Sequence, residues 1–238
     1  DQNGNIIDPF KGRLDLEKKI FRHTSPAFDE DPLRVLRFAR FKSYAQLNDF
    51  NLHEETKVFF SNIIASNELN DLSPERVWME TKKALDSKFS EEFFKTIITY
   101  QLTDPWFKNL KNISCDGDLP ELKWADMQRV NSFQLSELLP TPNSFQKMQE
   151  SLKQVLDFIG CKNKTEKFKL IEKMNVHRNY ETFLNIKKYD SLKEYLDYLE
   201  KIFESVMAID FSSLSTINAS EVSHEKQLLY YEALKEIL

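Results

Sequence analysis

One acidic and two basic side chains are spaced in a way that suits recognition of a nucleobase. Asp31 is followed three residues later by Arg34 and, after three more, by Arg37, with Pro32 in between. Residues three apart share a helix face, so the spacing predicts a carboxylate and two guanidiniums side by side near a helix start. A carboxylate only accepts hydrogen bonds and a guanidinium only donates them. Together they can imitate the pairing edge of a base.

Such an edge would discriminate among the four bases. Cytosine and adenine offer an amino donor beside a ring acceptor, which Asp31 and Arg34 would satisfy. Guanine and uracil would place a carbonyl acceptor against the Asp31 carboxylate and a ring N–H donor against the Arg34 guanidinium. Each unpaired buried polar group costs about 1–3 kcal/mol, so two mismatches would strongly reject both bases. Arg37 would reach the phosphates or buttress Asp31. The alternative is an acidic helix cap followed by surface ion pairs of little energetic consequence.

The elements that must position these residues are helices. Glu30 and Asp31 lie where the positive end of a helix dipole favours carboxylates, and Pro32 fits the first turn. A second helix start is expected at Ser73, a natural N-cap that is followed by proline. Within that second helix Arg76 and Glu80 are four residues apart and are expected to pair.

The composition favours an all-α protein. The 238 residues include only 4 glycines and as many as 19 phenylalanines, which suits packed helices. A short strand is expected over residues 5–10 at the N-terminus. The fold is therefore predicted as a multi-helix neck, body and tail with a short N-terminal strand remnant. The expected helices span residues 15–21, 31–44, 51–67, 73–86, 90–100, 121–129, 132–138, 144–159, 164–174, 177–185, 189–208 and 221–237.

The charge pattern bears on partners. A net charge of −5 excludes a uniformly basic RNA binder but leaves room for local basic faces. One candidate RNA-binding face consists of the lysines of a later helix, although a solvated helix face would look the same. Its members are Lys162, Lys164, Lys167 and Lys169. Cys115 and Cys161 lie far apart, and neither a signal peptide nor a long apolar span is recognisable, so a reduced, cytoplasmic protein without a membrane segment is expected.

Three motifs in order give the chain a family resemblance. Residues 4–16 precede Arg22-His23-Thr24-Ser25-Pro26-Ala27-Phe28, then come residues 30–37, and then Leu72-Ser73-Pro74-Glu75-Arg76-Val77-Trp78-Met79-Glu80. This order and spacing resembles the class II bacterial tRNA nucleotidyltransferases, or CCA-adding enzymes, and their poly(A) polymerase relatives. The likeness covers about the first ninety residues, and residues 25–28 and 74–78 look closer to the CCA-adding branch.

The resemblance implies an activity and partners. Enzymes of this family transfer CMP and AMP from CTP and ATP to the 3′ end of tRNA and use magnesium. It implies three domains: the end of a catalytic head with a linker (1–24), a nucleotide-reading neck (25–113), and a tRNA-binding body and tail (114–238). It further implies that Asp31, Arg34 and Arg37 read the nucleotide. Supporting roles are implied for Glu30, Arg76 and Glu80 around the base-reading turn, and for Asp8, Gly12 and Asp15 in a flexible lever between head and neck.

Catalytic metal ligands are expected to lie outside this chain. Nucleotide transfer needs carboxylates that hold divalent metals on a rigid strand. The Asp-x-Asp spacings at Asp116 and Asp29 fall in predicted loop or helix-cap positions. We therefore expect no catalytic or metal-binding residue here and a missing N-terminal catalytic domain that holds the Mg²⁺. Two alternatives stay open, namely a poly(A) polymerase that selects only ATP and a non-catalytic helical RNA-binding module.

Overall fold

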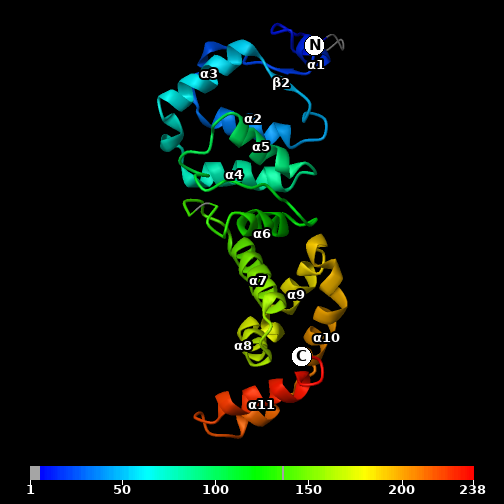
Figure 1. Ribbon diagram of the computed structural model, residues 1–238. Coiled ribbons are helices and arrows are strands. Elements are labelled where there is room, and N and C mark those ends of the chain that lie inside the picture. The colour runs from blue at the N-terminus through cyan, green and yellow to red at the C-terminus, as the bar shows by residue number, and fades with distance from the viewer. Residues whose placement is uncertain (1–5, 136) are drawn as a thin grey trace. The chain divides into compact units, whose positions relative to one another are not determined.

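A computed structural model of the chain describes residues 6–135 and 137–238. They form two compact units (Figure 1). Unit 1 comprises residues up to Cys115 together with Val130–Thr141, and unit 2 comprises Asp116–Arg129 and Pro142–Leu238. The predicted division at residues 24 and 113 remains a prediction. No helix in the described part of the chain has the length and apolar character that crossing a membrane requires.

The elements of unit 1 surround one central helix, α2 (Leu33–Lys42), which packs against α4 (Pro74–Leu85) and α5 (Ser90–Thr99) (Figure 1). Its inner face carries fully buried Val35, Leu36 and Ala39. The other elements are α1 (Gly12–Glu17), β1 (Ile20–Phe21), the 3₁₀ turn η1 (Pro26–Glu30), β2 (Asn51–Leu52), α3 (Glu54–Ala65) and the 3₁₀ turn η2 (Glu68–Asp71).

Unit 2 is helical and has its own apolar core. Phe158, Phe183 and Phe203 lie at its centre, and the last two stack with ring centroids 4.9 Å apart. Its elements are α6 (Pro120–Val130), α7 (Asn143–Gly160), α8 (Lys164–Met174), α9 (Val176–Ile186), η3 (Asp190–Tyr195), α10 (Leu196–Met207), η4 (Ser212–Ser215) and α11 (Val222–Leu234).

The fold is mostly α-helical, as predicted, but its small sheet lies elsewhere than expected. Asn5 falls outside the described residues, and residues 6–10 form loop and turn instead of a strand. The strands are β1 and β2, which run parallel and pair Ile20 with Asn51 and Phe21 with Leu52. The chain turns at Lys19, whose φ is 55°, so the helix predicted to reach residue 21 ends at Glu17.

A second correction concerns the helix predicted over residues 132–138. The described residues of this segment form turns, and Ser132 and Phe133 both have φ of 58°. The reason lies just before them, at Asn131. Its side-chain oxygen accepts the N–H groups of Lys111 at 2.8 Å and Asn112 at 3.0 Å, which ties the chain to a neighbouring loop and ends α6.

Candidate functional site

Asp31 lies directly before α2 and not in its first turn. Its backbone is extended, with φ −133° and ψ 100°. Its carboxylate accepts the N–H of Leu33 at 3.1 Å, and its carbonyl accepts the N–H of Arg34 at 3.1 Å. Asp31 therefore helps to cap the helix, and the prediction that it shares a regular helix face with Arg34 is wrong at this point.

Arg76 holds the Asp31 carboxylate. Its Nη2 donates to both carboxylate oxygens, at 3.0 and 2.9 Å, with the Asp31 side chain 29% and the Arg76 side chain 49% exposed. Arg76 sits in the first turn of α4, where Ser73 Oγ accepts its backbone N–H at 3.4 Å. The predicted pair between Arg76 and Glu80 is therefore wrong, since Arg76 is turned toward the N-terminus of α2.

Glu80 pairs with Arg40, a residue that the sequence reasoning missed. Both side chains are buried, and Arg40 Nε lies 2.5 Å from Glu80 Oε2. Arg40 also donates to the Tyr44 hydroxyl and lies over the Phe41 ring at 4.4 Å. A signal was present, because Glu80 follows Val77 by three residues and therefore falls on the apolar face of α4. A buried acid on an apolar face needs a cation.

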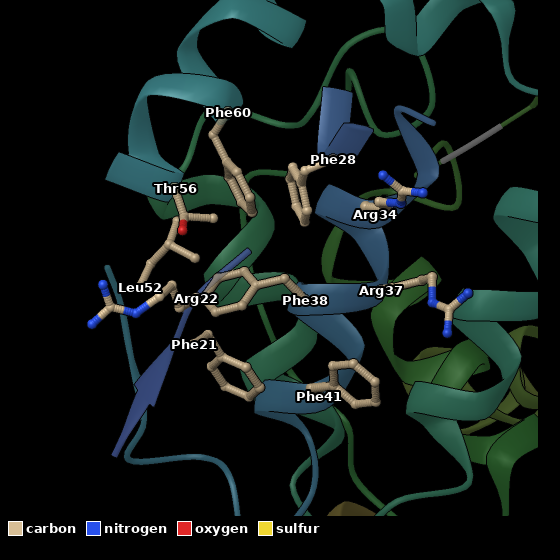
Figure 2. A pocket seen from close by; sticks show the side chains of 10 residues that line it. All are labelled: Phe21, Arg22, Phe28, Arg34, Arg37, Phe38, Phe41, Leu52, Thr56 and Phe60. Carbon is tan, nitrogen blue, oxygen red and sulfur yellow. The ribbon is translucent and has the colours of Figure 1, made fainter. Parts of the chain in front are cut away.

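Arg34 and Arg37 border an aromatic cavity of about 300 Å³ in unit 1. Figure 2 shows both side chains extending from α2 on the same side, with Arg22 on the opposite side of the ring cluster. Arg34 donates to the carbonyl of Ala27 and lies 5.7 Å from the Phe28 ring. The cavity wall consists largely of phenylalanine rings, namely Phe21, Phe28, Phe38, Phe41 and Phe60. Aromatic walls suit a flat, uncharged ring, and guanidiniums at the edge suit negatively charged groups attached to such a ring.

The predicted supporting residues near the N-terminus are organised around α1. Asp8 accepts the N–H groups of Gly12 at 2.6 Å and Arg13 at 2.9 Å, and these bonds lower the pKa of the Asp8 carboxyl. Asp15 is buried, and its carboxylate accepts hydrogen bonds from Arg22 Nε at 2.9 Å and Nη2 at 3.1 Å. This hydrogen bond raises the pKa of Arg22. Glu30 is exposed at the end of η1. The lever role stays a prediction.

The four candidate RNA-binding lysines lie in unit 2 and differ in their surroundings. Lys162 is exposed, Lys164 donates to the carbonyl of Lys235 at 2.8 Å, and Lys169 lies 3.5 Å from Glu166. Lys167 is half-buried and donates to the Tyr198 hydroxyl at 3.0 Å. Its Nζ also lies 5.0 Å from the centre of the Phe158 ring. Lys167 therefore stabilises the helix packing and offers less to a ligand than the other three.

The Asp-x-Asp at residues 116–118 has a structural use. The Asp116 carboxylate accepts the backbone N–H groups of Asp190 at 3.2 Å and Ser191 at 2.8 Å, and the Ser191 hydroxyl at 2.7 Å. It thereby caps η3. Within the described residues, no group of three or more His, Cys, Asp or Glu side chains is placed to hold a metal ion.

Comparison with known proteins shows that parts of the chain are similar to described families and proteins. The family described as "Probable RNA and SrmB- binding site of polymerase A" matches residues 49–114. Proteins named Multifunctional CCA protein are 47% identical over 125 residues in Pseudoalteromonas atlantica and 53% identical over 98 residues in Hahella chejuensis. These alignments cover 52% and 41% of this chain. Parts of this chain are therefore similar to proteins named Multifunctional CCA protein and to a region described as a binding site of polymerase A.

The aligned part of the chain spans 30% of the first of these CCA proteins and 23% of the second. A third, from Haemophilus influenzae, is 49% identical over 96 residues, which are 40% of this chain and 23% of that protein. No solved structure matches the chain. The match to a family described by RNA binding includes α3, α4 and α5, and α4 carries Arg76, which holds the Asp31 carboxylate.

Proposed function

We propose that this chain is the nucleotide-selecting and tRNA-binding part of a CCA-adding tRNA nucleotidyltransferase. The support comes from the relatives, which carry the name Multifunctional CCA protein, and from the region described as an RNA-binding site. Because the aligned stretches span less than a third of these relatives, the transfer of CMP and AMP to tRNA 3′ ends is part of the proposal.

The hydrogen bonds that Leu33 and Arg76 donate to the Asp31 carboxylate are the main support for the proposed base-reading role. Oδ1 accepts from Leu33 and Arg76, whereas Oδ2 accepts from Arg76. A carboxylate oxygen has two accepting directions, so Oδ2 can still accept from the amino group of cytosine or adenine. The two fixed donors hold the carboxylate in one orientation, which is what selection by hydrogen-bond pattern requires.

Arg34 would supply the donor half of the edge. Its bond to the carbonyl of Ala27 uses one of the five N–H groups of a guanidinium. The others can donate to N3 of cytosine or N1 of adenine. Arg37, exposed one turn further along α2, would then meet the phosphates of the nucleotide.

The remaining parts of the proposed reaction are assigned as follows. Mg²⁺ would be held by carboxylates outside this chain, in a separate catalytic domain, and would activate the 3′-hydroxyl and the leaving pyrophosphate. The exposed lysines of unit 2 would contact tRNA phosphates, which carry most of the affinity of such complexes and none of the sequence readout.

The test is Asp31→Ala in the intact enzyme, with incorporation of all four nucleotides measured on a tRNA that lacks its CCA end. We expect the preference for CTP and ATP over GTP and UTP to fall by roughly tenfold or more, since one mismatched contact costs about 1–3 kcal/mol. Stability should fall only by about 1 kcal/mol, because the ion pair is largely exposed. Glu75→Ala, which removes an exposed acid from the first turn of α4, is the matched control.

An Asp31→Ala enzyme that melts earlier but keeps its base preference would contradict the base-reading role. A second candidate, a poly(A) polymerase, is favoured by the description of the matched family as a site of polymerase A. Incorporation of CTP against ATP on the same tRNA separates the two, because a poly(A) polymerase adds only AMP.

A further inference from the structure

A second groove in unit 1, of about 450 Å³, lies where α3 and α5 end. Ile63, Leu69 and Leu110 are buried and form its floor, and Ile98 is 41% exposed in its wall. An exposed isoleucine over a buried aliphatic floor offers area that a partner can remove from water.

The edge of this groove is made of side-chain amides. Asn67, Asn70 and Gln101 line it and are exposed. Asn67 and Gln101 have φ of 59° and 57°, at the points where the chain leaves α3 and α5. An amide offers both donors and an acceptor, so this edge complements an extended peptide backbone, which carries an N–H and a C=O on each residue.

The electrostatics of the groove favour a cation. Helices α3 and α5 both end at the groove, and a helix C-terminus carries partial negative charge. The exposed carboxylate of Asp104 adds a full negative charge. Among the described residues that line the groove, none is Lys or Arg. Lys108 lies 3.8 Å from Asp104, but both side chains are exposed, so this pair is weak and screened.

Hydrogen bonds within unit 1 hold the floor of the groove in place. Trp106 is buried, and its indole Nε1 donates to the carbonyl of Leu69 at 2.8 Å. The Thr103 carbonyl accepts the backbone N–H of Phe107, which closes the loop that carries Asp104. A braced groove loses little entropy when it is occupied.

We propose that this groove binds an extended, basic segment of a protein partner, with aliphatic side chains on Ile98 and the floor and a Lys or Arg at Asp104. RNA is disfavoured because its phosphates would face two helix C-termini and a carboxylate with no cation in the lining. The proposal is independent of base reading at Asp31, since it uses none of the same side chains.

The test uses the full chain and a fluorescein-labelled octapeptide of alternating leucine and lysine, followed by fluorescence anisotropy. Ile98→Ser removes the aliphatic wall and Asp104→Lys reverses the charge. Met79→Ser and Asp86→Lys make the same changes at exposed positions on and after α4, outside the groove. We expect each groove variant to weaken binding about tenfold, and each control to stay within about twofold of the unmodified chain.

Three results would overturn the proposal. The first is no measurable binding of the leucine–lysine peptide to the unmodified chain. The second is an equal loss in Asp86→Lys, which would show unspecific attraction to a protein of net charge −5. The third is a labelled oligoadenylate that binds the chain and loses affinity in both groove variants, which would make the groove an RNA surface.

Discussion

Replacing Glu80 with leucine should destabilise unit 1 far more than removing the exposed ion pair of Arg76, one turn earlier in the same helix. Glu80 and Arg40 are both buried, 2.5 Å apart, and link α4 to α2. Without Glu80 the Arg40 guanidinium stays buried beside the Tyr44 side chain and the Phe41 ring. Neither carries a charge that could neutralise it.

The magnitude follows from the difference in burial. Removing one partner of a buried ion pair costs about 3–5 kcal/mol, because the other charge is left uncompensated. We take the lower end for Glu80→Leu, about 3 kcal/mol, since Arg40 keeps its hydroxyl and ring contacts. Arg76→Ala breaks a pair whose side chains are 49% and 29% exposed, so about 1 kcal/mol or less is expected there.

A third variant separates charge burial from lost packing. Arg40→Met combined with Glu80→Leu removes both charges and keeps most of the side-chain volume. Replacing a whole buried pair by apolar side chains is often neutral or stabilising. The double variant should therefore regain most of the stability that Glu80→Leu loses.

The measurement must follow unit 1 separately, because tryptophans occur in both units. Urea titrations read by hydrogen exchange of peptides from α2 and α4 report on unit 1 alone. The reasoning would be refuted if Glu80→Leu lowered the free energy of unfolding by less than about 1 kcal/mol, or if the double variant were no more stable than the single one. An unpaired buried charge should cost more than that.

Two further predictions concern unit 2. Burial and the hydrogen bond to Asp126 raise the pKa of Tyr189. The stability that this contact gives is therefore present at neutral pH and is lost as the pH rises above about 10, where the unfolded chain loses the tyrosine proton first. Between neutral and alkaline pH, the urea midpoint of Tyr189→Phe should therefore fall less than that of the unmodified chain. Reversing three exposed lysines to glutamate should weaken tRNA binding and flatten its salt dependence, as measured by filter binding at several salt concentrations, whereas Lys167→Glu should chiefly lower the melting temperature. The three lysines are Lys162, Lys164 and Lys169.

Most helices were predictable because their signals are local. Ser73 followed by Pro74 marks the start of α4, and the structure has both in these positions. The range 164–174 for α8 coincides with the structure, where the Asn163 side chain accepts the Glu166 N–H at 3.0 Å. A cap is formed by residues within one turn, so sequence alone can reveal it.

The partners of charged side chains were less predictable, because they depend on how distant segments pack. Arg76 lies four residues from Glu80 but 45 from Asp31, and the local pair was the natural expectation. The paired strands β1 and β2 are likewise separated by α2, and their two-residue lengths leave no periodic signal. The strand expected over residues 5–10 does not form, and the apolar side chains of Ile6 and Ile7 within it are exposed.

The two ion pairs together hold the acid before α2, which we propose reads a base, against the neighbouring helix α4. Asp31 is tied to Arg76 at the start of α4, and Arg40, near the end of α2, is tied to Glu80 one turn further along α4. The two links lie at two points along α2 and α4 and add to the apolar packing that already sets the position of these helices. The Arg40–Glu80 link is buried, whereas the Asp31–Arg76 link is open to solvent, where the proposed nucleotide would bind. Loss of Glu80 should therefore relax the proposed base selection through a displaced Arg76, although Glu80 itself is buried away from any nucleotide.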